Sequence, residues 1–545
     1  MLNQEAIKEL LLDNEFLTNQ NAQFRSYCQE LADFFTPRKG WINSIKIQGE
    51  RVKFNFLFDS TAILAARETA NGFHTHLTNP TARWFGIQYR NKKIRDLKEV
   101  KTFCHDVEEW SLGKLKDSNF YNMTPEYFHD KLVFGQGTFS MLGGEKKFVN
   151  YTEIPVGQVN RVIDAEGDLI GLFRNFSLTA RQAFKLWGSA AGESVIKAYI
   201  ERPNESFDFV HYAGERTTRE VNKLDASNMP FMSVWIGKKD KNAIAESGFM
   251  EMPYFSEVFY KDSTDPNGFS PAMDMLPWVK LVNAMARTTI RGAMKQVDPA
   301  YQSPNKGYVL PLNFNPSAIN YRDPKTPSDA LQVMPTGNGR IDLGKDLIEM
   351  YMQKIERGMF VDLFRSFNEI TKQMTVPEVQ QRVAQGMAML GPVVTRDNST
   401  LGRMITRLIN MGARDPMSGF PEMPEGLENE HYDLVYLSTL AKAQNQSELG
   451  EIQGFLGDVA NLGAIIPSVF DKIDEDKTID VMHRIRGVTP EIMREDEEIK
   501  RIRKHREEQN QIIAQLQAGQ AVGDIVKTGS EANKNLVTAE AGEKR

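Results

Sequence analysis

The sequence lacks the motifs that most often reveal an enzyme. It has no G-x-x-x-x-G-K-[ST] loop to cradle a nucleotide phosphate, no G-x-S-x-G nucleophile turn, and no H-E-x-x-H or C-x-x-C motif. The carboxylates are scattered over predicted helices and are typical of solvated helix faces. We therefore predict that the chain is not an enzyme and that it uses no cofactor.

Cysteine and basic charge are also scarce. Cys28 and Cys104 are the only cysteines, which excludes a disulfide framework and favours a reducing compartment. The net charge of −6 lacks the basic footprint of a tight nucleic-acid-binding domain. No apolar run approaches the roughly 18 residues of a membrane-spanning helix, and the first ten residues do not resemble a signal peptide. We therefore expect no membrane insertion by this chain.

Two short patterns resemble sites, but each has a simpler interpretation. His74 and His76 have a spacing that places two rings on one face only in a strand, whereas their surroundings predict the end of a helix. They are expected to cap or pack, so no metal site is predicted. Gly135-Gln-Gly137 lacks a third glycine and is predicted to form a turn.

The first 269 residues predict a mixed α+β unit. Helical spacing of apolar residues predicts helices over about 1–36, 59–71, 96–118 and 124–134. Thr124 is expected at the N-cap of the last of these, with Pro125 at its first helical position. Between about 138 and 260, β-branched and aromatic runs predict strands at 156–162, 171–176, 207–212 and 232–236, with a hairpin turn at 164–167 and helical segments at 179–187 and 194–202.

Two long predicted helices of similar length then enclose a compact insertion. The first covers about 270–295, the second about 343–367, and the residues between them are rich in proline, glycine and asparagine. Arg287, Arg291 and Lys295 recur every four residues on the first helix and form a stripe. This arrangement predicts a helical hairpin with a small domain at its tip.

The remaining chain is predicted to be largely helical. A capping box at Thr375 and Glu378 starts a helix to about 411, which Gly391-Pro392 is expected to kink. A strand is predicted at 432–437. A charge-dense helix is predicted at about 491–517, with acidic residues before basic ones as the helix dipole favours.

Several segments, in this order, resemble those of portal proteins, the head-to-tail connectors of short-tailed bacteriophages. They are L-T-N-P-T-A-R-W-F (77–85), S-P-A-M-D-M-L-P with the following K, N, T, R, K and V-D-P positions (270–299), F-V-D-L-F (360–364), T-V-P-E-V to G-P-V-V-T-R (375–396) and Y-L-S-T-L-A-K-A-Q (436–444). They span about residues 70–450. Their order is more specific than any single segment.

The resemblance implies a mainly helical α+β portal fold assembled as a dodecameric ring around a channel. Its parts would be a wing (1–269), stem helix 1 (270–296), a clip (297–342), stem helix 2 (343–367), a channel loop (368–375), a kinked wing helix and loop (376–430), a wing or crown segment (431–490) and a C-terminal crown or barrel helix with a mobile tail (491–545). Within the wing, Leu77–Ile87 is expected to anchor Trp84 and Phe85 in a core or a neighbour interface, with Arg83 paired locally.

The implied function is passage of viral double-stranded DNA through a capsid vertex during packaging and ejection. The implied partners are the terminase motor, a tail adaptor, and the major capsid and scaffolding proteins, with the protein in the virion and, during assembly, in the host cytoplasm. The DNA-channel candidates are Arg287, Arg291, Lys295, Lys372 and Gln373. For the stripe, salt bridges to an adjacent subunit are an equal alternative. A helical scaffold or adaptor without a channel is the alternative function.

Overall fold

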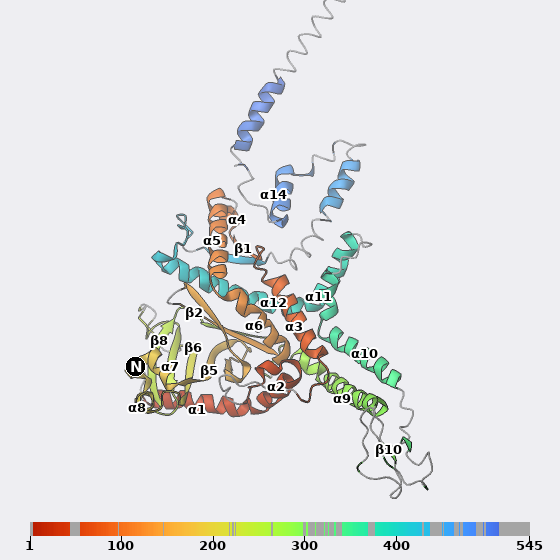
Figure 1. Ribbon diagram of the computed structural model, residues 1–545. Coiled ribbons are helices and arrows are strands. Elements are labelled where there is room, and N and C mark those ends of the chain that lie inside the picture. Colours follow the sequence, from red (N-terminus) through yellow and green to blue (C-terminus); the bar gives the residue numbers. More distant parts are fainter. Residues whose placement is uncertain are drawn as a thin grey trace, which may run out of the picture. The chain divides into compact units, whose positions relative to one another are not determined.

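The computed structural model describes residues 4–43, 55–95, 97–144, 147–216, 219–220, 223, 225–262, 265–297, 301–302, 311, 321, 325, 332–333, 341–368, 376–427, 430–436, 450, 452–462, 468, 472–486, 494 and 498–511 (Figure 1). The chain divides into two compact units. The first combines Met1–Gly86, Val107–Pro421 and Leu434–Ile466, and the second combines Ile87–Asp106, Glu422–Asp433 and Pro467–Arg545. The described elements are mostly helices with antiparallel sheets, which confirms the predicted mainly helical α+β class.

The N-terminal half alternates helices with two sheets. Its helices are α1 (Gln4–Gln20), α2 (Ala22–Phe35), α3 (Thr61–Leu77), α4 (Lys92–Arg95), α5 (Lys98–Asp117), α6 (Phe120–Phe134), α7 (Ala180–Trp187) and α8 (Glu193–Glu201). Its strands are β1 (Phe85–Tyr89), β2 (Gln136–Gly143), β3 (Val149–Glu153), β4 (Val159–Ile163), β5 (Leu169–Thr179), β6 (Ser206–Glu215), β7 (Phe231–Gly237), β8 (Asn242–Phe249) and β9 (Tyr254–Val258).

The larger sheet is covered by helices from two directions. Its five antiparallel strands follow the order β4-β5-β6-β7-β8. Ile7 of α1 belongs to one buried cluster with Phe173 and Val210, whereas α7 and α8 supply Ala183 and Val195 to another cluster that includes Phe209. Alternate strand residues point to opposite faces, so the two clusters lie on the two sides of the sheet.

The predicted β4–β5 hairpin is confirmed, with one change. Gly167 takes the turn at φ 82°, a left-handed conformation that glycine adopts without strain. Residues 156–158 were predicted as part of the strand but form a 3₁₀ turn, so β4 begins only at Val159. The second sheet has the order β3-β2-β9.

The predicted start of α6 at Thr124 is wrong. The helix begins four residues earlier, at Phe120, and Pro125 lies inside it. The Phe120 side chain is fully buried against Trp84 and Tyr151, and this packing extends the helix past a residue that usually marks its first turn. Gly135 ends α6 in the left-handed conformation at φ 82°, but the predicted turn over Gly135–Gly137 is limited to this residue, because Gln136 and Gly137 belong to β2.

The Leu77–Ile87 stretch is an anchor in the interior of the chain. Trp84 and Phe85 are 1% and 0% exposed and contact each other with ring centroids 4.8 Å apart. The Arg83 guanidinium lies 3.0 Å from the Glu108 carboxylate. The core location and the local pairing of Arg83 are confirmed.

The C-terminal half is dominated by four helices. They are α9 (Pro271–Val297), α10 (Ile341–Gly358), α11 (Val361–Asn368) and α12 (Val376–Arg414). The single helix predicted over 343–367 is interrupted, because Phe360 adopts φ 63° and separates α10 from α11. Between α9 and α10, β10 (Tyr301–Gln302) pairs antiparallel with β11 (Gln332–Val333). Most of the other residues of the predicted clip lie outside the described residues.

The second unit contains α4, the start of α5, α14 (Glu475–Arg486) and a helical stretch over 498–511. The predicted strand at 432–437 is present as β12 (Tyr432–Tyr436), which pairs with β1. Arg503 donates to Asp476 at 2.6 and 2.8 Å and links the 498–511 stretch to α14. The predicted helix at 491–517 is therefore described only in its middle. No helix among the described residues is long and apolar enough to cross a membrane.

Candidate functional site

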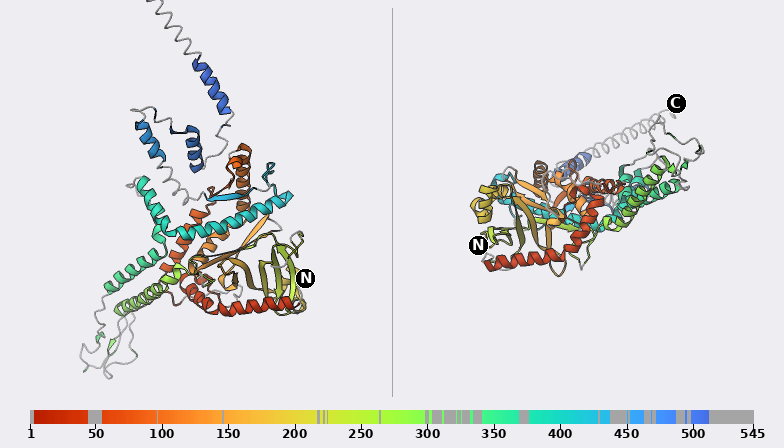
Figure 2. Two further views of the ribbon diagram at one scale, coloured as in Figure 1. Left: turned by 180° about the vertical axis from the view of Figure 1, so that it is seen from behind. Right: turned by 60° about the horizontal axis from the view of Figure 1, so that its bottom comes forward.

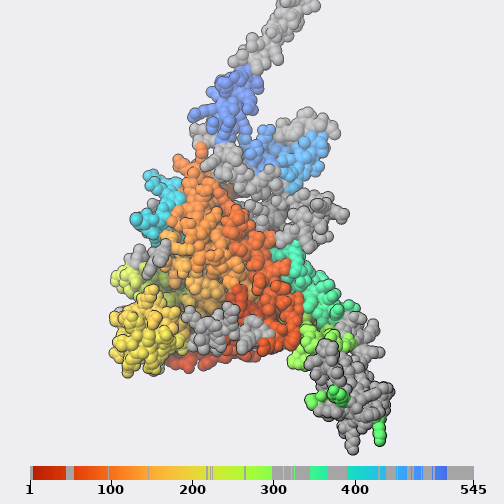
Figure 3. Space-filling model, viewed as in Figure 1, coloured from red at the N-terminus to blue at the C-terminus, as the bar shows by residue number. Residues whose placement is uncertain are grey.

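The α9–α10 hairpin is the element on which most candidate residues lie. A Cβ at Gly358 would approach Met275 to 2.2 Å, and one at Gly344 would approach Thr289 to 3.2 Å. The first turns of α9 thus contact the end of α10, and the last turns of α9 contact the start of α10. The two helices are therefore antiparallel. Both views of the ribbon show them side by side (Figure 2), and parts of both reach the surface in green and teal (Figure 3).

An aromatic contact holds the two helices together near the base of the hairpin. The rings of Trp278 and Tyr351 stack with centroids 5.1 Å apart, and the Lys354 ammonium lies 5.2 and 5.1 Å from them. The face of α9 that carries Trp278 therefore contacts α10. This contact fixes which sides of both helices remain outward.

The basic stripe lies on the outer side of α9. The nine residues from Trp278 to Arg287 make about 2.5 helical turns, so Arg287 points away from α10, and Arg291 and Lys295 follow at four-residue steps. All three side chains are exposed. Arg287 lies 5.8 Å from the Phe58 ring, whereas Arg291 and Lys295 form no ion pair with any residue that the structure describes.

The outer side of α10 carries carboxylates. Glu349 and Asp346 precede Tyr351 by two and five residues, which correspond to rotations of about 200° and 500°, and both therefore point away from α9. Both side chains are exposed and neither forms an ion pair within the described part of the chain. Lys345 and Arg357 flank this face. The hairpin thus has a basic outer side on α9 and two acidic residues on the outer side of α10.

Contacts from α3 explain why the second long helix is interrupted. The Thr69 hydroxyl donates to the Met359 carbonyl at 2.7 Å, and Met359 is fully buried. After the break, Arg365 of α11 donates to both carboxylate oxygens of Glu68 at 2.8 and 2.9 Å. These bonds attach α11 to α3 and turn the chain away from the axis of α10.

The two histidines near the end of α3 have packing roles. His76 stacks on Phe364 with ring centroids 5.7 Å apart, and His74 shares a hydrogen bond of 3.0 Å with the Thr78 hydroxyl. Burial lowers the pKa of both imidazoles. The predicted role in capping and packing is confirmed.

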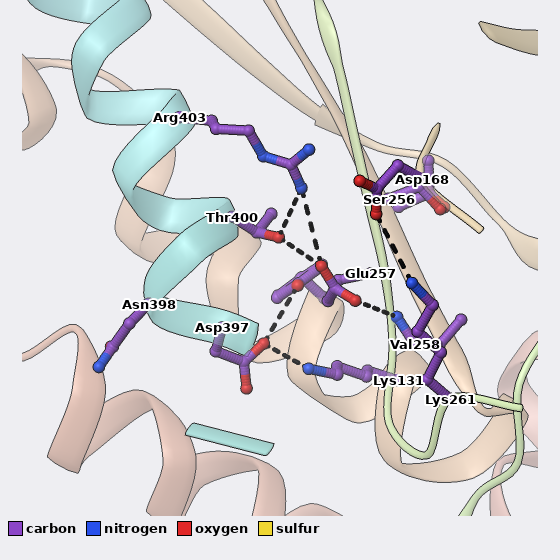
Figure 4. Close-up of polar contacts among 12 residues, drawn as sticks. Lys131, Asp168, Ser256, Glu257, Val258, Lys261, Asp397, Asn398, Thr400 and Arg403 are labelled. Carbon is purple, nitrogen blue, oxygen red and sulfur yellow. Dashed lines mark hydrogen bonds and ion pairs between the residues drawn. The ribbon is translucent and has the colours of Figure 1, made fainter. Parts of the chain in front are cut away.

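A buried polar network attaches α12 to α6 and β9 (Figure 4). The Lys131 ammonium lies 2.5 Å from an Asp397 carboxylate oxygen, and the Tyr127 hydroxyl donates to the same oxygen at 3.3 Å. Nearby, Thr400 donates to Glu257 at 2.7 Å and Arg403 lies 3.7 Å from it. Burial raises the pKa of Asp397, while Lys131 acts in the opposite direction.

The anchored part of α12 begins close to the Gly391-Pro392 pair. Helical residues continue without a break from Val376 to Arg414, so the structure has no interruption at the predicted kink position. Leu390 and Val393 are already buried, and Arg396 makes the first side-chain hydrogen bond to another described element by donating to the Phe259 carbonyl. The sequence analysis missed this network, because Lys131 and Asp397 have no distinctive local motif.

Some expected features lie outside the described residues. Lys372, Gln373 and Thr375 belong to residues 369–375, which the structure does not describe. Sequence analysis also did not single out the acidic group formed by Asp164, Glu166 and Asp168. The Lys261 ammonium lies 3.5 Å from Asp168 and already supplies a positive charge there. We therefore do not assign a metal site to this group.

Comparison with known proteins identifies the family. The model for "Bacteriophage head to tail connecting protein" matches residues 8–493. The chain is 26% identical over 537 residues to the "Portal protein" of Salmonella phage epsilon15, covering 97% of this chain and 96% of that protein. It is 24% identical over 526 residues to the "Probable portal protein" of Bordetella phage BPP-1, covering 94% of both. The predicted resemblance is confirmed, and the chain belongs to the family of bacteriophage head-to-tail connecting proteins.

Proposed function

We propose that this connector protein forms a closed ring around a channel for viral double-stranded DNA. The observation that carries the proposal is that the outer side of α9 carries three cations whereas the outer side of α10 presents two carboxylates. Arg287, Arg291 and Lys295 lie on one side, and Asp346 and Glu349 lie on the other. A surface of this kind is complementary to the next copy in a head-to-tail array, not to itself.

Head-to-tail contacts generate a ring when the rotation between copies closes. In the proposed ring, the basic side of α9 faces the acidic side of α10 of the next copy. Apolar side chains that are exposed in the single chain add area to the interface. They are Ile290 and Met294 on α9 and Met350 on α10.

This arrangement favours the neighbour-subunit role for the stripe over direct contact with DNA. Strong phosphate contacts at every subunit would slow a polymer that has to slide in both directions. A stripe neutralised by Asp346 and Glu349 of the next copy leaves little net attraction for the phosphates. Lys372 and Gln373, which follow α11 in the sequence, are then the remaining candidates for the lumen.

The other parts receive the roles expected for a portal. Residues 1–269 and 376–430 form the wing, 270–296 and 343–367 the stem, 297–342 the clip, 368–375 the channel loop, and 431–545 the remaining wing and crown or barrel. The clip contacts the packaging motor and then the tail adaptor, while the wing and crown contact the major capsid and scaffolding proteins. The protein resides at one capsid vertex in the virion and in the host cytoplasm during assembly.

Charge reversal tests the proposed contact directly. Arg291→Glu and Glu349→Arg are each expected to place like charges across the interface and to reduce the ring fraction, because like-charge contacts are repulsive. The double variant should recover rings. Light scattering and negative-stain imaging give the readout, and Lys223→Glu, an exposed site on a different segment, provides the matched control.

Light scattering and negative-stain imaging of the wild-type protein distinguish a ring from a scaffold or adaptor without a channel. Rings with a central hole, and a mass that is a large multiple of 61.9 kDa, are expected. A monodisperse monomer at micromolar concentration would favour a scaffold or adaptor without a channel. Intact rings in both single variants would instead contradict the assigned contact.

A further inference from the structure

A cavity of about 660 Å³ lies in the first unit, away from the hairpin. Its walls come from α2, the segment after it, α6, and the β3–β4 and β5–β7 regions, and include Trp41, Phe134 and Phe176. This volume is within the range of about 300–1,000 Å³ that is typical of small-molecule sites. The distribution of charge along its walls indicates the class of ligand.

At one end of the cavity the charges are already paired. The Lys39 ammonium lies 3.0 Å from Glu126, 2.5 Å from Asp130 and 3.1 Å from Glu153. Arg38 lies 2.9 Å from Glu126. Three carboxyl groups therefore contact two cations, so this end has no spare positive charge to attract an anion.

The other end holds two cations without an ion-pair partner among the described residues. The half-buried Arg25 donates from Nη2 to the neutral Asn160 amide oxygen at 2.8 Å, and its buried Nε has no hydrogen-bond partner there. Lys238 directly follows β7, and this exposed residue lines the same cavity. Burial lowers the pKa of Lys238, and the positive charge of Arg25 acts in the same direction.

Two acids act on Lys238 without forming an ion pair with it. Asp208, which also lines the cavity, and Glu15 both raise the pKa of Lys238, but neither forms an ion pair with it in the described structure. The Asp208 carboxylate instead accepts a hydrogen bond of 2.6 Å from the Ser177 hydroxyl. Two neighbouring like charges facing one cavity repel each other, and an anion between them would relieve that repulsion.

We propose that this end of the cavity binds a small oxyanion, a phosphate or carboxylate group, between Arg25 and Lys238. The guanidinium presents a planar set of charged donors that matches two oxygens of such a group. Lys238 contributes a second positive charge from another element. Trp41 and Phe176 provide apolar surface for the remainder of a larger ligand.

Calorimetric titration of the purified full-length protein tests the site, with inorganic phosphate and acetate as separate probes at matched ionic strength. Saturable binding of phosphate, acetate or both is expected, and the stronger probe identifies the oxyanion class. Arg25→Gln and Lys238→Met should each weaken binding about tenfold or more, since each removes a charge-assisted hydrogen bond.

Lys239→Met is the matched control. Lys239 follows directly in the chain, but its ammonium lies 3.8 Å from Glu205 and 4.7 Å from the Phe207 ring, so its loss should leave the affinity unchanged. Arg25 also donates a hydrogen bond to Asn160, so Arg25→Gln could weaken binding by destabilising the protein. If Arg25→Gln lowers the melting temperature of the ligand-free protein, the affinity of Lys238→Met is the test of the site. Absence of saturable binding by both probes, or wild-type affinity in Lys238→Met, would overturn the proposal.

Discussion

Lys131 of α6 and Asp397 of α12 form an ion pair of 2.5 Å whose side chains are 2% and 1% exposed. The pair joins two helices that are 266 residues apart in the chain. Removing one member of such a pair leaves the other charged and without compensation in the interior. The attachment of α12 to α6 therefore depends on both residues being present.

Asp397→Ala is expected to destabilise the protein by about 3–5 kcal/mol, because Lys131 would remain buried without its partner. The double variant Lys131→Met with Asp397→Leu should regain most of this loss, since no charge is left buried. Thermal unfolding provides the measurement. Lys223→Ala breaks an exposed ion pair with Glu220 and should change stability by less than about 1 kcal/mol. Equal melting temperatures for Asp397→Ala and wild type would contradict the role of the pair.

The packing of α3 against α11 predicts opposite effects for the same substitution at two helical glycines. Alanine usually stabilises a helix interior by about 1 kcal/mol relative to glycine. At Gly72, however, a Cβ would lie 2.5 Å from the Phe364 ring, so Gly72→Ala should destabilise by about 1–3 kcal/mol through overpacking. At Gly113 a Cβ would meet nothing within 4 Å, and Gly113→Ala should be stabilising. Parallel melting curves decide; stabilisation in both variants would show that Phe364 moves aside without cost.

The sequence was sufficient where a pattern is local. Trp84, Phe85 and Arg83 stand beside one another, and the resemblance of this stretch to the same stretch in portal proteins was enough to expect the burial of the two rings and the pairing of Arg83. The interruption at Phe360 was not predicted, since it depends on Thr69 about 290 residues away bonding the Met359 carbonyl.

The start of α6 is a case in which a local sequence signal gave the wrong prediction. Thr124 and Pro125 have a strong local preference for a helix start, yet the helix begins at Phe120. Burial of Phe120 against Trp84 and Tyr151 outweighs that local preference. Helix propensities do not include such tertiary packing, so the sequence alone did not predict this start. Lys131 and Asp397 were missed for the same reason, because their pairing exists only after α6 and α12 pack together.

Two buried histidines predict a loss of stability on acidification. Burial lowers the pKa of His129 and of His211 to about 3, whereas the unfolded-state value is about 6.5. Between these values the unfolded chain binds protons that the folded chain does not, so the free energy of unfolding falls as pH decreases. At pH 5 each histidine accounts for a loss of about 2 kcal/mol.

Glu153 acts in the opposite direction over part of this range. Its pKa is raised to about 8, chiefly by burial and also by Asp130, so the folded protein retains a proton between about pH 4.5 and 8 that the unfolded chain releases. The destabilisation by the two histidines exceeds the stabilisation by the one carboxyl group, so the free energy of unfolding still decreases between pH 6.5 and pH 5. Glu153→Gln removes the opposing contribution and should make the loss steeper. Melting temperatures across this range test both statements, with the exposed His505→Gln as control. A melting temperature that does not fall on acidification would contradict them.

The last prediction concerns Lys372 and Gln373 and depends on the proposed channel. In sequence, both residues follow α11, which Glu68 holds through Arg365, and precede α12, which Lys131 holds through Asp397. Because the stripe on α9 has acidic partners available on the next copy, Lys372 is the candidate whose charge is left for DNA phosphates. Lys372→Glu with Gln373→Glu should leave ring formation unchanged but reduce the retention of packaged DNA, since a carboxylate repels phosphate.

The control for this prediction is the same charge change elsewhere on the chain. Lys223→Glu, at an exposed position between β6 and β7, should affect neither ring formation nor DNA retention. Particles are assembled with each variant and assayed for nuclease-protected DNA at increasing salt. Because salt screens exposed charges, the difference between the Lys372→Glu, Gln373→Glu variant and wild type should shrink as ionic strength rises. Normal DNA retention at low salt, in particles with normal rings, would show that these two residues do not contact the genome. That result would not contradict the proposed contact between Arg291 and Glu349, which has its own test.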